Sequence, residues 1–205
     1  MTQQVIPPAA RAPHLADRGP KGARTREQLF LAALAEFRRS GVEAASIGEI
    51  ARLAGTSRAS FYFHYPCKDA VLLDLQWRLE TTIVEHVREQ RTLRAALAAL
   101  IDSLIAVQAT LAPGDLMRDM LSVYIRRPAG VDLAEQAFPL MMHVGRRFAE
   151  AKGKELRRGI DPVVGTQLFL SSLFGLVASS AQPLTERRDD LRQLATLFLE
   201  SPRRA

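Results

Sequence analysis

Hydrophobic positions recur at helical spacing along most of the chain, and no segment alternates long enough to predict a strand. The clearest example is a helix that opens near Thr25, where Thr25 and Gln28 have the spacing of a capping box. Its apolar face carries Phe30, Ala33, Leu34 and Phe37. Gly41 follows and ends the helix. The pattern therefore predicts an amphipathic helix that packs on a small core.

Two shorter helices are predicted next, with a glycine turn between them. Ser46 and Glu49 have the spacing of a second capping box, and apolar residues at 47, 50, 51 and 54 share one face. Gly55 lies where a positive φ is needed, and Ser57 can cap the helix that Pro66 ends. This arrangement is a helix-turn-helix, which can place its second helix in the major groove of DNA.

The rest of the chain is also predicted to be helical. We expect helices at about 69–88, 93–111, 115–125, 133–151 and 186–199. The segment 162–185 has no charged residue, but its polar residues argue against a membrane span. A helix that is apolar on all sides needs more neighbours than one small domain supplies, so we expect it to contact a second copy of the chain.

Charge is distributed unevenly along the 205 residues, whose net charge is +6. Up to Lys68 the chain has ten Lys/Arg and five Asp/Glu, and beyond it eighteen and seventeen. The excess of positive charge therefore coincides with the helix-turn-helix, as attraction to phosphate would require. An alternative is an arginine-rich chain in which this asymmetry has no function.

The segment from about Thr25 to Leu72 closely resembles the TetR/AcrR family of bacterial transcriptional regulators. The resemblance is carried by F-x-x-x-G-V, S-I-G-E-I-A-x-x-A-G, S-x-x-x-F-Y-x-H-Y and K-D-A-V-L. It implies an all-α protein with an N-terminal three-helix helix-turn-helix domain and a C-terminal helical ligand-binding and dimerisation domain. The expected boundaries are a flexible arm at 1–22, a DNA-binding domain at 23–68 and the second domain at 69–205.

The same resemblance implies which residues touch DNA. They are Ser46, Gly48, Ser57, Arg58, Ala59, Ser60, Tyr62, Phe63, His64 and Lys68. Arg58 can make a bidentate contact to guanine or bind phosphate only, and the methyl group of Ala59 can meet a thymine methyl. Phe63 departs from the commoner polar residue or tyrosine, so its role is open. Phe61 and Tyr65 fit the core better.

An effector site is expected between about Asp69 and Ala181. The candidate lining residues are Trp77, Met120, Tyr124, Phe138, Met142, His143 and Phe174, although helical spacing alone would also place such residues in a plain core. The leading hypothesis is a homodimeric repressor, paired through its last two helices and released from a palindromic operator by a small hydrophobic ligand. Alternatives are an activator, a partner-controlled regulator, or a helical small-molecule-binding enzyme or carrier.

Other site chemistries have no sequence signal. No nucleotide-binding, serine hydrolase or zinc-protease motif occurs, and the four histidines are scattered, so we predict no catalytic residue, no metal and no cofactor. The single cysteine, Cys67, fits a reducing cytoplasm and has no resolving partner for a redox switch. The N-terminal arm either has no function in binding or contacts DNA through its basic residues.

Overall fold

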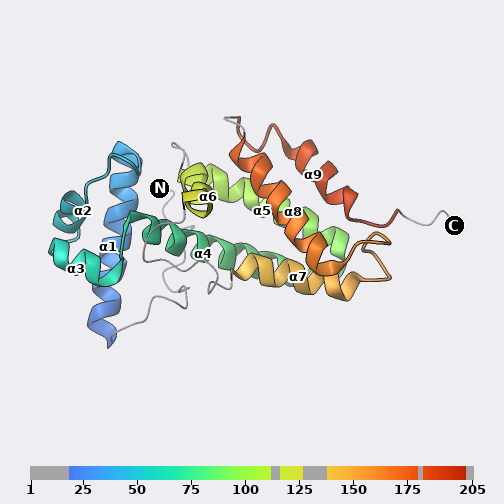
Figure 1. Ribbon diagram of the computed structural model, residues 1–205, viewed down its shortest axis with the longest axis horizontal. Coiled ribbons are helices and arrows are strands. Elements are labelled where there is room, and N and C mark those ends of the chain that lie inside the picture. Colours follow the sequence, from blue (N-terminus) through green and yellow to red (C-terminus); the bar gives the residue numbers. More distant parts are fainter. Residues whose placement is uncertain (1–18, 112–115, 127–137, 180–181, 202–205) are drawn as a thin grey trace. The chain divides into compact units, whose positions relative to one another are not determined.

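The computed structural model describes residues 19–111, 116–126, 138–179 and 182–201, except for the side chains of 124–126. In these ranges the chain forms helices and no named strand, which confirms the all-α prediction (Figure 1). The chain divides into two compact units. Unit 1 comprises Met1–Arg78 and Leu111–Gln136, and unit 2 comprises Leu79–Thr110 and Ala137–Ala205.

Unit 1 contains the three N-terminal helices: α1 (Gly19–Ser40), α2 (Ile47–Leu53) and α3 (Arg58–His64). Helix α1 packs against both α2 and α3 (Figure 1). The unit also holds the first half of α4 (Lys68–Val87) and α6 (Leu116–Arg126). Fully buried aromatic side chains fill the space between the helices: Phe30, Phe61 and Tyr65 are each 0% exposed. This core gives the helix-turn-helix the support that the sequence predicted.

Unit 2 contains the second half of α4, α5 (Leu93–Leu111, up to residue 110), α7 (Pro139–Ala151), α8 (Pro162–Ala178) and α9 (Arg188–Leu197). Helix α8 packs on both α7 and α9. Phe148, Phe169 and Phe198 meet at their contact, with ring centroids 5.5–5.9 Å apart. Asp161 caps α8 by accepting hydrogen bonds from two backbone amides of its first turn.

Both predicted capping boxes are wrong in detail. Ser46 is the N-cap of α2, but its side chain makes no capping hydrogen bond. The carboxylate of Glu49 instead pairs with Arg52, 2.6 Å away. Helix α1 begins at Gly19, so Thr25 lies inside it, and the Thr25 hydroxyl donates to the Lys21 carbonyl. The segment that was expected to be a flexible arm to residue 22 is thus helical from Gly19 onward.

Within the described ranges, α5 alone is long and apolar enough to cross a membrane on length and composition. A helix buried in a protein core meets the same criteria. The inward residues of α5, such as Leu97, Leu100 and Ile101, are at most 2% exposed in the folded chain. Its one acid, Asp102, pairs with Arg188 near the start of α9. We therefore interpret α5 as a core helix of unit 2.

Candidate nucleic-acid interface

The turn between α2 and α3 is built by its glycine and its cap. Gly55 adopts φ +65°, a conformation that a side chain would strain. The amide of Thr56 donates to the Ala51 carbonyl, which closes the end of α2. The hydroxyl oxygen of Ser57 then accepts from the Ser60 amide at 3.1 Å and starts α3. Ser57 thus has a local structural task in addition to its predicted contact with DNA.

Helix α3 divides into a buried side and an exposed side. Phe61 and Tyr65 face the core, with ring centroids 5.9 Å apart. Arg58 and Ala59 are exposed, and so are Tyr62 (50%) and Phe63 (56%). Ser60 and His64 are half-buried. Two large aromatic side chains are thus exposed on one short helix, which makes this side of α3 a candidate contact surface.

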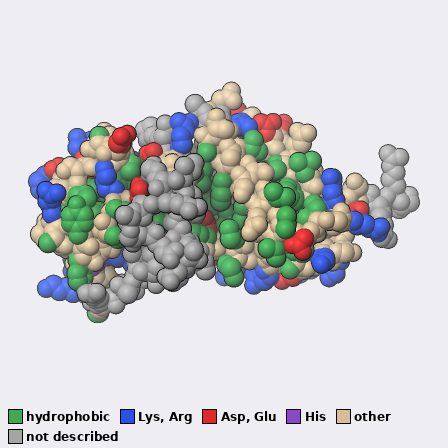
Figure 2. Space-filling view, viewed as in Figure 1, with side chains coloured by type: hydrophobic (Ala, Val, Ile, Leu, Met, Phe, Trp, Pro, Cys, Tyr) green, Lys and Arg blue, Asp and Glu red, His purple; other side chains and the backbone are tan. Residues whose placement is uncertain are grey.

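The start of α2 lies beside the start of α3. A Cβ placed on Gly48 would lie 3.5 Å from the Ser46 hydroxyl oxygen and 3.9 Å from Cδ of Arg58. Three residues that the sequence predicted as DNA contacts, Ser46, Gly48 and Arg58, are therefore neighbours in space. Figure 2 shows Lys and Arg side chains next to hydrophobic ones over α1–α3.

The arginines around this surface differ in their partners. Arg52 pairs with Glu49, and Arg39 pairs with Glu36 through two hydrogen bonds of 2.8 Å. Arg58 has no ion-pair or hydrogen-bond partner among the residues that the structure describes. Its guanidinium is the one on α2 and α3 that remains available to an external anion.

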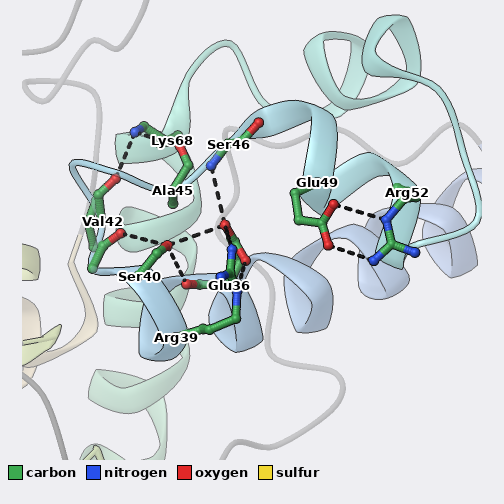
Figure 3. A network of polar contacts seen from close by, with 10 residues as sticks. Glu36, Arg39, Ser40, Val42, Ala45, Ser46, Glu49, Arg52 and Lys68 are labelled. Carbon is green, nitrogen blue, oxygen red and sulfur yellow. Dashed lines mark hydrogen bonds and ion pairs between the residues drawn. The ribbon is translucent and has the colours of Figure 1, made fainter.

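Glu36 organises the loop between α1 and α2 (Figure 3). Its carboxylate is 1% exposed and accepts hydrogen bonds from Arg39, from the Ser40 hydroxyl at 3.2 Å and from the Ser46 amide at 3.5 Å. The hydrogen bond from Arg39 lowers the pKa of Glu36 below its ordinary value, against the effect of desolvation. A carboxylate on α1 thereby holds Ser46, the first of the residues predicted to contact DNA, in place.

Lys68 occupies a position that its charge alone did not predict. Its ammonium group donates to the backbone carbonyls of Val42 and Glu43 at 2.7 Å and of Ala45 at 3.0 Å (Figure 3). These three bonds use all three N–H donors of the side chain. Lys68 thus ties the first turn of α4 to the α1–α2 loop. In this arrangement it positions the helix-turn-helix, and a phosphate would have to compete with the three carbonyls.

A buried ionic cluster, which we call the Asp74 cluster, joins α1 to α4 within unit 1. Asp74 is 0% exposed and accepts from Arg26 at 2.7 Å, from the Tyr65 hydroxyl at 2.7 Å and from Arg78 at 3.2 Å. Arg78 also makes two hydrogen bonds to Glu27, at 2.7 and 3.0 Å. Burial, followed by the charge of Asp74, raises the pKa of Tyr65, so the phenol stays a neutral donor.

The sequence reasoning missed the Asp74 cluster, although one signal was present. Asp74 and Arg78 are four residues apart, in a helix whose neighbouring positions, such as Leu72 and Leu75, form a wide apolar face. Charged residues on such a face must find partners when they are buried. The long-range partners of the cluster, on α1, had no counterpart in local spacing.

The predicted effector residues are divided between the two units. Trp77, Met120 and Tyr124 belong to unit 1, whereas Phe138, Met142, His143 and Phe174 belong to unit 2. Met120, Phe138 and His143 are buried, and Trp77 and Phe174 are half-buried. Met142 is 64% exposed, and the side chain of Tyr124 lies outside the described residues. Among those residues, no group of three or more metal-ligating side chains is placed to hold an ion.

His143 is the most unusual member of this set. It is 5% exposed, and neither ring nitrogen has a hydrogen-bond partner among the described residues. Burial, aided by the nearby Arg146 and Arg147, lowers its pKa, so the imidazole is neutral at pH 7. A neutral buried imidazole can both donate and accept one hydrogen bond.

Residues 29–75 match the family model described as bacterial regulatory proteins, tetR family. Over 88 residues, 41% of this chain, the sequence is 33% identical to two proteins of Pseudomonas putida. One is the HTH-type transcriptional regulator SrpR. The other is the uncharacterized HTH-type transcriptional regulator TtgW. The match spans 41% of SrpR and 66% of TtgW, less than two thirds of either relative.

Solved structures extend the likeness in fold to most of the chain. Thermus thermophilus FadR, a TetR-family repressor solved in complex with lauroyl-CoA, superposes with a TM-score of 0.69 at 24% identity, over 88% of this chain and 98% of that one. Salmonella enterica GusR gives a TM-score of 0.64 at 21% identity, over 90% of this chain and 100% of that one. Such identities show a shared fold: an N-terminal helix-turn-helix followed by a helical domain.

Proposed function

We propose that the chain, whose residues 29–75 match the tetR family model, is a DNA-binding transcriptional repressor of that family. It acts in the cytoplasm as a homodimer on a palindromic operator and leaves the operator when a small hydrophobic ligand binds. The observation that carries this proposal is the exposed side of α3, where Arg58 has no partner among the described residues and Tyr62 and Phe63 stand in solvent.

Recognition of DNA by this surface needs both base reading and phosphate contacts. Arg58 near the start of α3 can form two hydrogen bonds with the N7 and O6 atoms of guanine, and the exposed Ala59 beside it can meet a thymine methyl. Tyr62, farther along the helix, suits a phosphate oxygen, and the flat ring of Phe63 suits a sugar or a thymine. The half-buried Gly48 and the exposed Ser46 allow the backbone of α2 to approach the DNA strand closely.

The test is operator binding by Arg58→Ala, with Arg52→Ala as its matched control. Both residues are exposed arginines of the helix-turn-helix, but Arg52 already has a partner in Glu49. Arg58→Ala should weaken operator binding by about 1–3 kcal/mol and relax the preference at one base pair. Arg52→Ala should change the affinity much less. Base reading by Arg58 would be contradicted if both variants lost the same binding free energy and if that loss were the same on operator and on random DNA.

Dimerisation is proposed through one face of α8 and α9. Val163, Val164 and Leu168 on α8 are 51–67% exposed in the single chain, and Leu197 on α9 is 52% exposed. Along α8 this face continues through Ser171, Ser172 and Gly175, small residues that let a second helix approach closely. A two-fold axis would place each such face against its copy and bury it.

The residues for a dimerisation test follow from burial. Leu173 and Leu194 are 0% and 9% exposed, so they face the core of their own protomer, and a charge at either would unfold unit 2 rather than split a dimer. Leu168→Glu should instead give a folded monomer in sedimentation at micromolar concentration. Leu31→Glu is the control, because Leu31 is 56% exposed on α1, outside this face. A Leu168→Glu variant that remains dimeric would exclude this interface.

The effector is proposed to be a hydrophobic molecule held by the helices of unit 2. Support comes from the structure of Thermus thermophilus FadR in complex with lauroyl-CoA, and from the unsatisfied ring nitrogens of the buried His143. Helix α4 begins in unit 1 and ends in unit 2, so it can pass a displacement from one to the other. Operator half-sites lie about 34–36 Å apart, or a multiple of this distance. A small change in the distance between the two α3 helices of a dimer therefore weakens operator binding.

Release by a ligand has a calculable requirement. A ligand must shift the dimer from a state that is almost fully able to bind DNA to one that is almost fully unable. This shift requires the ligand to bind the second state more tightly than the first by about 5.5 kcal/mol, which the two ligands of a dimer can share. Fluorescence of Trp77, the only tryptophan, should respond to a true inducer. A screen that finds tight ligands, none of which changes operator affinity, would contradict this part of the proposal and leave an activator or a partner-controlled regulator.

A further inference from the structure

Unit 2 contains a polar hollow of about 440 Å³ that the proposed repressor function leaves unused. It lies where the loop between α7 and α8 meets the start of α5 and the segment after α9. The lining residues are Arg94, Gly153, Lys154, Glu155, Leu156, Arg158, Leu199, Glu200 and Ser201. Its volume lies in the range of small-molecule sites. Its lining is charged, whereas the lining of the predicted effector site is apolar.

The floor of the hollow is held by backbone hydrogen bonds. Leu156 and Leu199 form an isolated antiparallel β-bridge and are 2% and 5% exposed. On either side of the bridge, the Arg157 amide donates to the Phe198 carbonyl at 2.9 Å, and the Glu200 amide donates to the Glu155 carbonyl at 2.7 Å. The two segments therefore form a preformed surface, and a ligand would not have to order a loop in order to bind.

The charges around this floor are not paired with one another. Arg94, Lys154 and Arg158 are exposed, and none has a carboxylate within 4.0 Å among the described residues. The two carboxylates of the hollow bond to backbone instead. Glu155 accepts from the Arg94 amide at 3.3 Å, and Glu200 accepts from the Arg158 amide at 3.0 Å. Three cations thus surround the hollow without forming ion pairs to the two carboxylates that line it.

Each carboxylate keeps one oxygen for a ligand. The bonds to backbone amides use Oε2 of Glu155 and Oε2 of Glu200. Oε1 of each accepts no hydrogen bond from the residues that the structure describes, so it can accept one from a ligand. Arg94 keeps most of its donors as well, since the one hydrogen bond from its side chain to a described residue is a 3.4 Å contact to the Glu200 carbonyl. The hollow therefore offers cationic donors and carboxylate acceptors side by side.

We propose that this hollow binds a phosphorylated, hydroxyl-bearing small molecule of the sugar-phosphate class. Lys154, Arg158 and Arg94 would hold the phosphate, because charge-assisted hydrogen bonds to arginine and lysine are the strongest that a phosphate makes in water. The free oxygens of Glu155 and Glu200 would accept from hydroxyl groups of the sugar. Carboxylates disfavour a bare anion, so the hydroxyl groups are a necessary part of the ligand. Figure 2 shows Lys, Arg and acidic side chains together at the end of unit 2 near the C-terminus.

The test is isothermal titration of the full chain with ribose 5-phosphate at constant ionic strength, with ribose and inorganic phosphate as separate arms. We expect ribose 5-phosphate to bind with a dissociation constant below about 1 mM, and each of the other two at least about tenfold more weakly. The double variant Lys154→Gln/Arg158→Gln should lose about tenfold or more, since each charged hydrogen bond is a substantial part of such an affinity. Glu200→Gln should weaken ribose 5-phosphate but not inorganic phosphate.

The control variant is Arg146→Gln, an exposed arginine of α7 outside the hollow. It should bind ribose 5-phosphate as the unaltered chain does. Absence of binding at about 10 mM, or equal affinity of the double variant and the control, would overturn the site. Equal binding of inorganic phosphate and ribose 5-phosphate would overturn the role of the two carboxylates. No operator is needed, so this result is independent of the proposed repressor function.

Discussion

Removal of the buried carboxylate of Asp74 should destabilise unit 1 more than the loss of an exposed ion pair. Asp74 is fully buried and is the shared acceptor of Arg26, Tyr65 and Arg78. In Asp74→Ala both guanidinium groups stay buried. Arg78 still has Glu27, 2.7 Å away, but Arg26 loses the carboxylate with which it pairs. A poorly compensated charge in the interior is the costly result of this substitution.

The magnitude follows from burial. Breaking a buried ion pair from one side costs about 3–5 kcal/mol, whereas an exposed pair contributes about 0–1 kcal/mol. For a chain of this size, such a loss lowers the melting temperature by about 6–20 °C, at about 2–4 °C per kcal/mol. Glu49→Ala is the matched control, because Glu49 also pairs with an arginine of unit 1, Arg52, but the two side chains are 33% and 68% exposed. We expect that variant to lose about 1 kcal/mol at most.

The assay is urea unfolding followed by the fluorescence of Trp77, which lies in unit 1 and is the only tryptophan. The signal therefore reports the unit that contains the Asp74 cluster. Equal unfolding free energies for Asp74→Ala and Glu49→Ala would refute the reasoning. A second variant separates charge from packing. Arg26→Met/Tyr65→Phe/Asp74→Leu/Arg78→Met removes the three buried charges together with the hydroxyl that donates to Asp74, and it should recover most of the loss, because apolar replacement of a buried ionic group is often neutral or stabilising.

Three further substitutions test other parts of the structure. Lys68→Met should lower the free energy of unfolding by about 1–3 kcal/mol, because the α1–α2 loop loses its hydrogen bonds to the ammonium group, and should leave the salt dependence of DNA binding unchanged. If the plot of log affinity against log salt concentration became shallower by about one unit, Lys68 would contact a phosphate instead. Burial lowers the pKa of His143 below its ordinary value of 6.5, so protonation of this side chain opposes folding. The free energy of unfolding should therefore fall as the pH is lowered below 6.5. In His143→Leu this fall, measured by urea unfolding between about pH 7 and 5, should be smaller. Gly165→Ala should cost about 1–3 kcal/mol in thermal unfolding, because its Cβ would lie 2.6 Å from Ile160 Cγ2 and 3.3 Å from Phe148; an unchanged melting temperature would mean that Ile160 gives way.

The helices of this chain could be predicted from sequence because the 3.6-residue period is a property of each segment by itself. The predicted helix at 93–111 coincides with α5, and the one at 69–88 differs from α4 by one residue at each end. Caps were harder to predict, because they depend on which of several partners a side chain chooses. Glu49 had the spacing to reach back to Ser46, yet Arg52 on the next turn offered a full positive charge.

The candidate site was predictable in its location and less so in the tasks of its residues. Arg58 and Lys68 carry the same charge, and the resemblance to the TetR family implied a contact with DNA for both. Only the fold shows that three carbonyls of the α1–α2 loop surround the ammonium of Lys68, whereas no described polar group pairs with Arg58. These carbonyl groups belong to the backbone, so no pattern of side chains along the sequence predicts that they bind Lys68.

The same distinction limits how much of the N-terminal charge can act on DNA. Of the ten basic residues up to Lys68, four are bound to partners inside the protein: Arg26, Arg39, Arg52 and Lys68. Among the described residues, four more are exposed and have no such partner: Lys21, Arg24, Arg38 and Arg58. If these four alone met phosphates, a dimer would neutralise about eight, and the logarithm of operator affinity would fall by about 7 per tenfold increase in salt. A measured slope clearly steeper than this would mean that the internal pairs open on DNA or that the segment before Gly19 also binds, and a variant lacking residues 1–18 would distinguish the two.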